Sequence, residues 1–249
     1  MKRIKLVVAY DGTAYHGWQL QPKEVTIEGK LNEALQQLTG ETIQVIGASR
    51  TDAGVHALGN VAVFDTESRI PAEKFSYALN QRLPADIVVQ SSQEVAADFH
   101  PRHCHCRKTY EYTILNRPFP LPEYRNTAYF CYGDIQIDKM QEAAQAFIGE
   151  HDFVGFCSAG AQVKTTVRTI YSLEVQRIDQ DRICIRVQGS GFLYNMVRII
   201  AGTLLQVGQG KIDPSDMERI IASCDRSQAG PTAPPQGLRL VEINYQEVE

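Results

Sequence analysis

The chain has 249 residues, of which 43% are apolar and 22% charged, and its formal net charge is −4. This length suits one large or two small domains, and the composition is typical of a globular protein with a substantial core. The net charge excludes a polycation that coats nucleic acid, but it allows a local basic cleft. The sequence contains no run of about 18 apolar residues, which argues against a membrane span.

The compartment can be predicted from the start of the chain and from the cysteines. The first residues, M-K-R-I-K-L-V-V-A-Y, lack the apolar core and cleavage site of a signal peptide. The cysteines are scattered, mostly among apolar residues, which favours reduced thiols over a disulfide framework. We therefore expect a cytoplasmic protein. The six positions are Cys104, Cys106, Cys131, Cys157, Cys184 and Cys224.

The first part of the chain reads as alternating strands and helices. Residues 4–10 are β-branched and apolar, which predicts a strand. Apolar spacing predicts a helix that begins after the N-cap Thr26 and ends at Gly40. Pro71 starts a second helix, and residues 87–89 form a short strand. Between the first strand and helix, T-A-Y-H-G-W-Q contains Tyr15 and Trp18, which we expect to fold back over the core.

Residues 47–59, G-A-S-R-T-D-A-G-V-H-A-L-G, form a long connection between two apolar runs at 43–45 and 61–63. The loop places the carboxylate of Asp52 near Arg50 and His56. Glycines within it permit unusual backbone angles and close approach by a partner, and chemistry often sits on such loops. Spacing alone supports equally well a long hairpin in which Arg50 and Asp52 pair in solvent.

A basic and aromatic run follows at residues 99–112, F-H-P-R-H-C-H-C-R-K-T-Y-E-Y. Arg102, Arg107 and Lys108 are positively charged, three histidines can add charge, and Tyr110 and Tyr112 interleave with them. Basic side chains neutralise phosphates and aromatic rings stack on unpaired bases, so the run indicates an RNA contact.

The same run contains five candidate metal ligands, His100, His103, Cys104, His105 and Cys106. Neighbouring side chains of an extended segment point to opposite faces, which separates the histidines from the cysteines. The sequence has no second ligand pair at a spacing typical of zinc sites. We therefore do not expect a metal site in this run.

The second half repeats the order helix, strand, loop, strand, which indicates a duplicated α+β unit. Asp138 and Gln141 match a capping box for a helix that ends at Gly149, and alternation predicts strands over 170–175 and 183–187. Asp213 and Pro214 open a last helix with Cys224 facing inward. A proline-rich loop at 226–237 leads to a closing strand at 238–248.

Residues 192–207, F-L-Y-N-M-V-R-I-I-A-G-T-L-L-Q-V, are apolar on nearly all sides and predict a buried helix. Its one charge is Arg198, and a buried guanidinium is costly unless it is paired. Either Arg198 extends its head to water along the helix, or it meets a carboxylate of the protein. Asp52 is the candidate for that carboxylate.

Six segments together resemble the tRNA pseudouridine synthase A (TruA) family, in the family's order and over the full length. They are Y-D-G-T-A-Y-H-G-W-Q at 10–19, R-T-D-A-G-V-H at 50–56, F-H-P-R at 99–102, K-T-Y-E-Y at 108–112, F-L-Y-N-M-V-R at 192–198 and G-L-R-L at 237–240. The family's F-x-A-R-F pattern reads F-H-P-R-H here, so His103 replaces an aromatic residue.

This resemblance implies an α+β protein of two similar halves, with mostly antiparallel sheets joined across a central cleft. We expect an N-terminal half at 1–104 and a C-terminal half at 105–249. The implied activity is isomerisation of uridine to pseudouridine at positions 38, 39 and 40 of the tRNA anticodon stem-loop. It also implies a homodimer that acts on tRNA without a cofactor.

By resemblance, Asp52 matches the catalytic aspartate, Tyr110 the tyrosine that stacks on the target base, and Arg198 the arginine that pairs with the aspartate. Arg50 matches the basic residue that helps to flip the base, and Leu238 lines the pocket. The expected tRNA contacts are Arg50, Phe99, His100, Pro101, Arg102, His103, Arg107, Lys108, Tyr110, Arg168 and Leu238.

Two points stay open at this stage. Asp52 can attack the sugar, attack the base or remove a sugar proton, and Tyr110 can stack on the base, remove its C5 proton or simply pack in the core. A non-catalytic tRNA-binding protein or chaperone would use the same surface, but it would have no need for a carboxylate facing phosphates.

Overall fold

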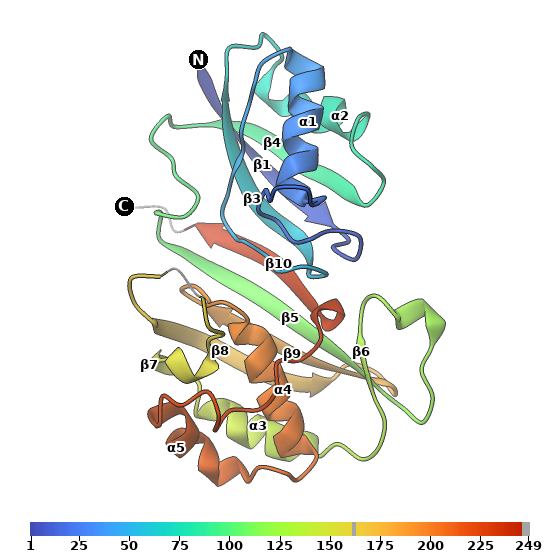
Figure 1. The fold of residues 1–249 in the computed structure, drawn as a ribbon, viewed down its shortest axis with the longest axis vertical. Helices are drawn as coiled ribbons and strands as arrows, with labels where there is room; N and C mark the ends of the chain where they lie inside the picture. Colours follow the sequence, from blue (N-terminus) through green and yellow to red (C-terminus); the bar gives the residue numbers. More distant parts are fainter. Residues whose placement is uncertain (161–162, 246–249) are drawn as a thin grey trace. The chain divides into compact units, whose positions relative to one another are not determined.

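The computed structural model describes residues 1–160 and 163–245. The chain forms two compact units (Figure 1). The first contains Met1–His105 together with the chain from Leu240 on, and the second contains Cys106–Arg239. No helix in these described residues is long and apolar enough to cross a membrane.

The first unit is a sheet with two helices side by side along it (Figure 1). Its strands run in the order β4-β1-β3-β10, and β2 also pairs with β3. The pairs β1–β3, β1–β4 and β2–β3 are antiparallel. The elements are β1 (Lys2–Tyr10), α1 (Ile27–Thr39), β2 (Ile46–Gly47), β3 (His56–Thr66), a 3₁₀ turn (Ala72–Lys74), α2 (Phe75–Asn80), β4 (Ile87–Val95) and β10 (Leu238–Tyr245).

Helix α1 forms where the sequence predicts it. The Thr26 side chain accepts a hydrogen bond from the amide of Gly29, and Gly40 ends the helix in the left-handed conformation with a φ of 77°. Ile27, Leu31 and Leu35 are fully buried, and each contributes about 1.5–3 kcal/mol by leaving water. Caps and apolar spacing therefore agree, and the prediction is confirmed.

The second unit has strands in the order β5-β9-β8-β7, with β6 parallel to β5. The pairs β5–β9, β8–β9 and β7–β8 are antiparallel, and α3 and α4 pack against each other. Its strands and helices are β5 (Cys106–Asn116), β6 (Tyr129–Cys131), α3 (Ile137–Gln145), β7 (Gly149–Asp152), β8 (Val167–Arg177), β9 (Arg182–Gly189), α4 (Met196–Gly208) and α5 (Met217–Ala222). Short 3₁₀ turns lie at Pro122–Tyr124, Val154–Phe156, Pro214–Asp216 and Pro235–Gly237.

The two units repeat one arrangement. In each, a helix leads into a short strand that pairs antiparallel with the long strand after it, as α1–β2–β3 and as α3–β7–β8. The predicted α+β class, with two similar halves and mostly antiparallel sheets, is confirmed. The repeat differs in detail from the prediction, because β7 and β8, rather than β8 and β9, correspond to the strands on either side of Asp52.

The loop that contains Asp52 is shorter than the sequence predicts. Strand β3 already begins at His56, and β2 lies at 46–47 instead of 43–45. Gly59 is therefore a strand residue. A Cβ atom there would lie 2.8 Å from the carbonyl oxygen of Val241 on β10, so this glycine permits close strand packing instead of a turn.

Three further predictions are wrong. Helix α4 begins at Met196, four residues after the start of the apolar run. Asp138 lies inside the first turn of α3, whose N-cap is Gln136, so it does not form the predicted capping box with Gln141. Cys224 is exposed and follows α5 in a left-handed conformation instead of facing inward. The expected strand to residue 248 is described as far as Tyr245, and its remainder lies outside the described residues.

Candidate active site

The loop between β2 and β3 carries Asp52 at a tight turn. The amide of Val55 donates to the carbonyl of Asp52 at 3.1 Å, and the amide of Ala48 donates to the carbonyl of Val61 on β3 at 2.7 Å. Thr51 is buried, Asp52 is half-buried and Arg50 is exposed. The loop thus presents a partly desolvated carboxylate beside an arginine that is open to a polyanion.

The segment at 12–18 holds this loop in place through its backbone. The amide of Trp18 donates to the carbonyl of Thr51 at 3.0 Å. A Cβ atom at Gly12 would overlap the carbonyl oxygen of Val55, and one at Gly17 would lie 2.6 Å from that of Thr51. Glycine is required at both positions because the two backbones touch.

The aromatic residues of this segment are scaffold residues. Trp18 is 1% exposed, and its ring lies over Gly47, where any Cβ would collide with it. Tyr15 is buried and donates its hydroxyl to Asp86 at 2.6 Å. Burial and this carboxylate raise the Tyr15 pKa. The expectation that the aromatic residues fold back over the core is confirmed.

His56 closes the loop on the other side. Its Nδ1 atom accepts from the amide of Gly12 at 3.1 Å and lies 3.1 Å from a carboxylate oxygen of Asp11. Its Nε2 atom is buried and has no hydrogen-bond partner in the described parts of the chain. Burial alone would raise the Asp11 pKa, but hydrogen bonds from Thr13 and the nearby imidazole lower it overall.

In the second unit, Arg198 lies in the first turn of α4 and is half-buried. Its Nε atom donates to the carbonyl of Ala233 at 2.7 Å, and Nη1 donates to Oδ1 of Asn195 at 2.6 Å. The amide nitrogen of Asn195 in turn donates to the Ser158 hydroxyl at 2.9 Å. The guanidinium is therefore fixed from two sides and is half-buried.

Tyr110 and Leu238 are both buried residues of the second unit. Tyr110, on β5, packs edge-on against Phe192, with ring centroids 5.2 Å apart. Leu238 follows Gly237, whose backbone touches the ring of Tyr112. Tyr112 donates to the carbonyl of Pro234 at 2.8 Å, and burial raises its pKa. The predicted stacking residue Tyr110 and the predicted pocket residue Leu238 are thus both packed within the protein.

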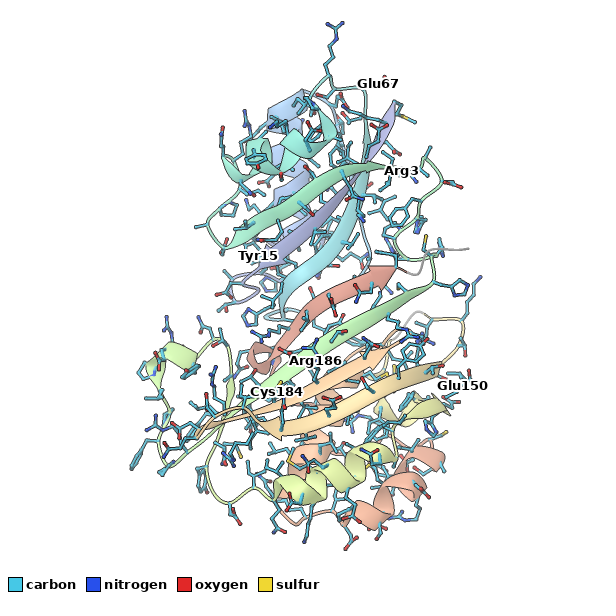
Figure 2. All side chains as sticks on the ribbon, turned by 180° about the vertical axis from the view of Figure 1, so that it is seen from behind. Arg3, Tyr15, Glu67, Glu150, Cys184 and Arg186 are labelled. Carbon is cyan, nitrogen blue, oxygen red and sulfur yellow. The ribbon has the colours of Figure 1, made fainter. Side chains whose placement is uncertain are left out.

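Glu111 follows Tyr110 on β5 and is buried, and its charge is compensated by two arginines. It accepts hydrogen bonds from Arg186, its neighbour on β9 (Figure 2), and from Nε of Arg239 at 2.9 Å. Two arginines around one carboxylate offset the cost of burying its charge. This pairing accounts for the acid in K-T-Y-E-Y and for the arginine in G-L-R-L.

The start of the basic run is fixed within the first unit. Arg3 of β1 (Figure 2) pairs with Asp65 and donates to the carbonyl of Phe99 at 3.0 Å. The Phe99 ring packs edge-on against Tyr245, whose hydroxyl donates to the carbonyl of Pro101 at 3.0 Å. Phe99 is half-buried and Pro101 is buried, so these residues hold the segment in place.

The charged members of the run face solvent. Arg102, His103, His105 and Arg107 are exposed. The rings of His100 and His103 lie 4.1 Å apart, and burial together with the His103 charge lowers the His100 pKa. The guanidinium of Arg107 sits over Tyr171 at 4.5 Å from the ring centroid.

The remaining expected contacts are less open to solvent. Lys108 is half-buried, and so is Arg168, which donates to the carbonyl of Thr165 at 2.9 Å. Burial lowers the Arg168 pKa. Across the described residues, no group of three or more His, Cys, Asp and Glu side chains is placed to hold a metal ion.

Sequence reasoning did not identify the side-chain hydrogen bonds that Tyr10, Asn60, Ser158 and Asn195 make near the predicted site residues. Tyr10 and Asn195 lie inside the motifs at 10–19 and 192–198, which is the signal that was available. The contacts of Tyr10 with Thr51 and of Asn195 with Ser158 join residues far apart in the sequence, so they appear only in the folded chain.

Comparisons with known proteins match most of the chain. A family model described as tRNA pseudouridine synthase matches residues 6–103 and 143–246. The tRNA pseudouridine synthase A of Ruminiclostridium cellulolyticum is 50% identical over 245 residues, which cover 98% of this chain and 100% of that protein. The proteins of the same name from Brevibacillus brevis and Geotalea daltonii are 48% and 46% identical, with the same coverage.

Among solved structures, this chain is similar to one in the archaeal box H/ACA sRNP Nop10-Cbf5 complex. The TM-score is 0.35 at 12% identity, and the match covers 95% of this chain and 46% of that chain. The sequence matches are far closer and extend over nearly the whole length. They show that this chain belongs to the tRNA pseudouridine synthase family.

Proposed function

We propose that this chain converts uridine to pseudouridine at positions 38, 39 and 40 of the tRNA anticodon stem-loop, and that it acts as a homodimer in the cytoplasm. Family membership identifies the chain as an isomerase that acts on tRNA uridine. The proposed positions rest on the resemblance of the six motifs. Buried thiols at Cys131, Cys157 and Cys184 are compatible with a reducing compartment.

The observation that carries the proposal is the half-buried carboxylate of Asp52 on a loop that is held from both sides. In the reaction, the bond between C1′ and N1 of uridine breaks, the uracil rotates, and C1′ joins C5. The C5 proton is lost and N1 gains one. A carboxylate beside the anomeric carbon serves each of the three routes open to Asp52: attack on the sugar, attack on the base, or removal of a sugar proton.

The other proposed residues act on the flipped nucleotide. Extrusion from a stem costs a few kcal/mol, and the exposed Arg50 is suited to brace the gap that the base leaves. Stacking on Tyr110 would return about 1–3 kcal/mol. We propose that Arg198 supplies the positive charge that keeps Asp52 ionised, and that Leu238 provides an apolar wall.

We also propose that the two halves carry different residues of the site, as the sequence suggests. An N-terminal half at 1–104 would carry the catalytic aspartate, and a C-terminal half at 105–249 would carry the stacking tyrosine and the arginine. The exposed charges of Arg102, His103 and Arg107 support a role in phosphate contact. In this proposal, Phe99, His100, Pro101, Lys108 and Arg168 complete the tRNA contacts.

The test uses unmodified tRNA with tritium at C5 of uridine and follows tritium release to water. We expect release by the wild type, and a loss of at least about 10³-fold in Asp52→Asn, which keeps the shape but removes the charge. Binding of tRNA should be retained. Asp134→Asn, at an exposed acid of the second unit, is the control and should remain active.

Two outcomes would contradict the proposal. Tight binding without release by the wild type on any tRNA would indicate a binding protein or chaperone. Release that persists when positions 38, 39 and 40 are all changed to cytidine would place the target elsewhere in the tRNA.

A further inference from the structure

A buried hydrogen-bond network lies directly beneath the loop that carries Asp52. Tyr10, the last residue of β1, is 5% exposed, and its hydroxyl lies 2.7 Å from Oγ1 of Thr51. Thr51 is also buried and precedes Asp52 in the chain. The end of the first strand is thus joined by a side-chain contact to the residue next to the carboxylate.

Asn60 of β3 completes the network from the opposite side. It is fully buried, and its amide nitrogen donates to the Tyr10 hydroxyl at 3.2 Å and to the carbonyl of Ser49 at 3.0 Å. Its oxygen accepts from the amide of Ser49 at 3.3 Å. Asn60 therefore ties Tyr10 and the start of the loop to one rigid strand.

These contacts restrict Thr51 in two independent ways. Its side chain is bonded to Tyr10, and its carbonyl accepts from Trp18. When the side chain and the backbone of a residue are both fixed, the orientation of the next residue in the chain is restricted as well. Buried networks with every partner satisfied are strong and specific because the local dielectric is low.

We propose that Tyr10 is a positioning residue for Asp52 and acts through Thr51. Tyr10 touches no reacting atom in this proposal. Its hydroxyl keeps Thr51 in one orientation, so the carboxylate stands ready before tRNA binds. A displacement of about 1 Å at a reacting group can cost about 10²-fold in rate. The inference rests on the proposed role of Asp52.

Tyr10→Phe removes one oxygen atom and leaves the ring in the core. We expect the single-turnover rate of tritium release to fall at least 10-fold, with the Kd for tRNA unchanged. Thr51→Val deletes the other partner and should cause a similar loss, whereas Thr51→Ser keeps the hydroxyl and should restore most of the rate. The double variant should be no slower than the slower single one, because both changes break one contact.

Thr66→Val is the matched control for stability. Thr66 is a buried threonine at the far end of β3, and its hydroxyl bonds Glu41 at 2.8 Å. The Thr66→Val variant should lose about as much unfolding free energy as Tyr10→Phe and Thr51→Val, but it should keep the wild-type rate of tritium release. A wild-type rate in Tyr10→Phe would overturn the inference, and so would a loss of rate in Thr66→Val as large as that in Tyr10→Phe or Thr51→Val.

The inference and the proposed function fail in different ways. An active Asp52→Asn would remove the basis of both, because Asp52 would then not be the catalytic carboxylate. An inactive Asp52→Asn beside a fully active Tyr10→Phe would leave the proposed function intact and reject the positioning role alone.

Discussion

At the scale of single residues, the backbone conformation of Asn195 allows its side chain to bind the guanidinium of Arg198. It adopts a left-handed conformation with a φ of 61° immediately before α4. Asparagine tolerates this region better than most residues. The conformation brings Oδ1 to the guanidinium of Arg198, and Ser158 holds the amide in the orientation that leaves this oxygen as the acceptor.

Substitutions of Asn195 should therefore change both the position of the Arg198 guanidinium and the charge that surrounds it. Asn195→Gly keeps the backbone angle and removes the acceptor, and we expect a reduction of several-fold in the rate of tritium release. Asn195→Asp keeps an acceptor but places a carboxylate against the guanidinium, which should compete for its positive charge. We expect a loss of at least 10-fold, larger than that of the glycine variant, in single-turnover assays at saturating enzyme.

A role of Asn195 in folding alone gives the opposite order. Aspartate tolerates the left-handed region and preserves the helix start, so Asn195→Asp would then be the more active variant. Thermal unfolding of both variants measures how much of any loss follows from stability.

At the scale of elements, the segment at 12–18 supports the loop that carries Asp52. Its glycines are required by contact. Gly17 has a φ of 84°, and a side chain there would press on the carbonyl of Thr51. Gly40, which ends α1 with a φ of 77°, has open space around it. The two glycines both have a positive φ and differ in their surroundings.

This difference gives a direct test of the support. Gly40→Ala should cost about 1–2 kcal/mol of unfolding free energy from the left-handed strain alone and should keep full activity. Gly17→Ala should cost more, because the loop must also move, and it should lower the rate of tritium release. Chemical denaturation and single-turnover rates measure the two effects separately. Equal costs and unchanged rates in both variants would show that the loop does not depend on this contact.

The sequence predicts those elements whose ends are set by local chemistry. Helix α1 is correct at both ends because Thr26 and Gly40 are local signals. The start of α4 is wrong because the apolar run begins before Met196, and the break at Asn195 depends on its tertiary partners. Gly59 is misread as a turn residue because the strand that packs against it lies more than 180 residues away.

In the candidate site too, some features have a local signal in the sequence and others depend on tertiary contacts. Asp52, Tyr110 and Arg198 can be selected from the sequence because their residue types and motifs carry a chemical meaning. The bonds between Tyr10 and Thr51 and between Asn195 and Ser158 join residues about 40 positions apart. A single sequence contains no signal for such pairs, so these contacts appear only in the structure.

At the scale of the whole molecule, the net charge of −4 and a polyanionic substrate must be reconciled. The distribution of charge resolves the conflict. Glu111 is neutralised within the protein by Arg186 and Arg239, whereas Arg102 and Arg107 extend into solvent. Binding should thus depend on a few local cations and be insensitive to the total charge.

Salt titration of tRNA binding tests this expectation. Each phosphate contact that is lost should reduce the slope of log K against log salt by about 0.7–0.9, so Arg102→Gln and Arg107→Gln should flatten the slope and weaken binding. Arg182→Gln changes the total charge equally, but Arg182 pairs with Asp179 at a turn. This control should bind tRNA with the wild-type slope. Counterion release at a local contact depends on which arginine is removed. If the slope and the affinity decreased equally in all three variants, tRNA binding would follow the total charge instead, and the expectation would be wrong.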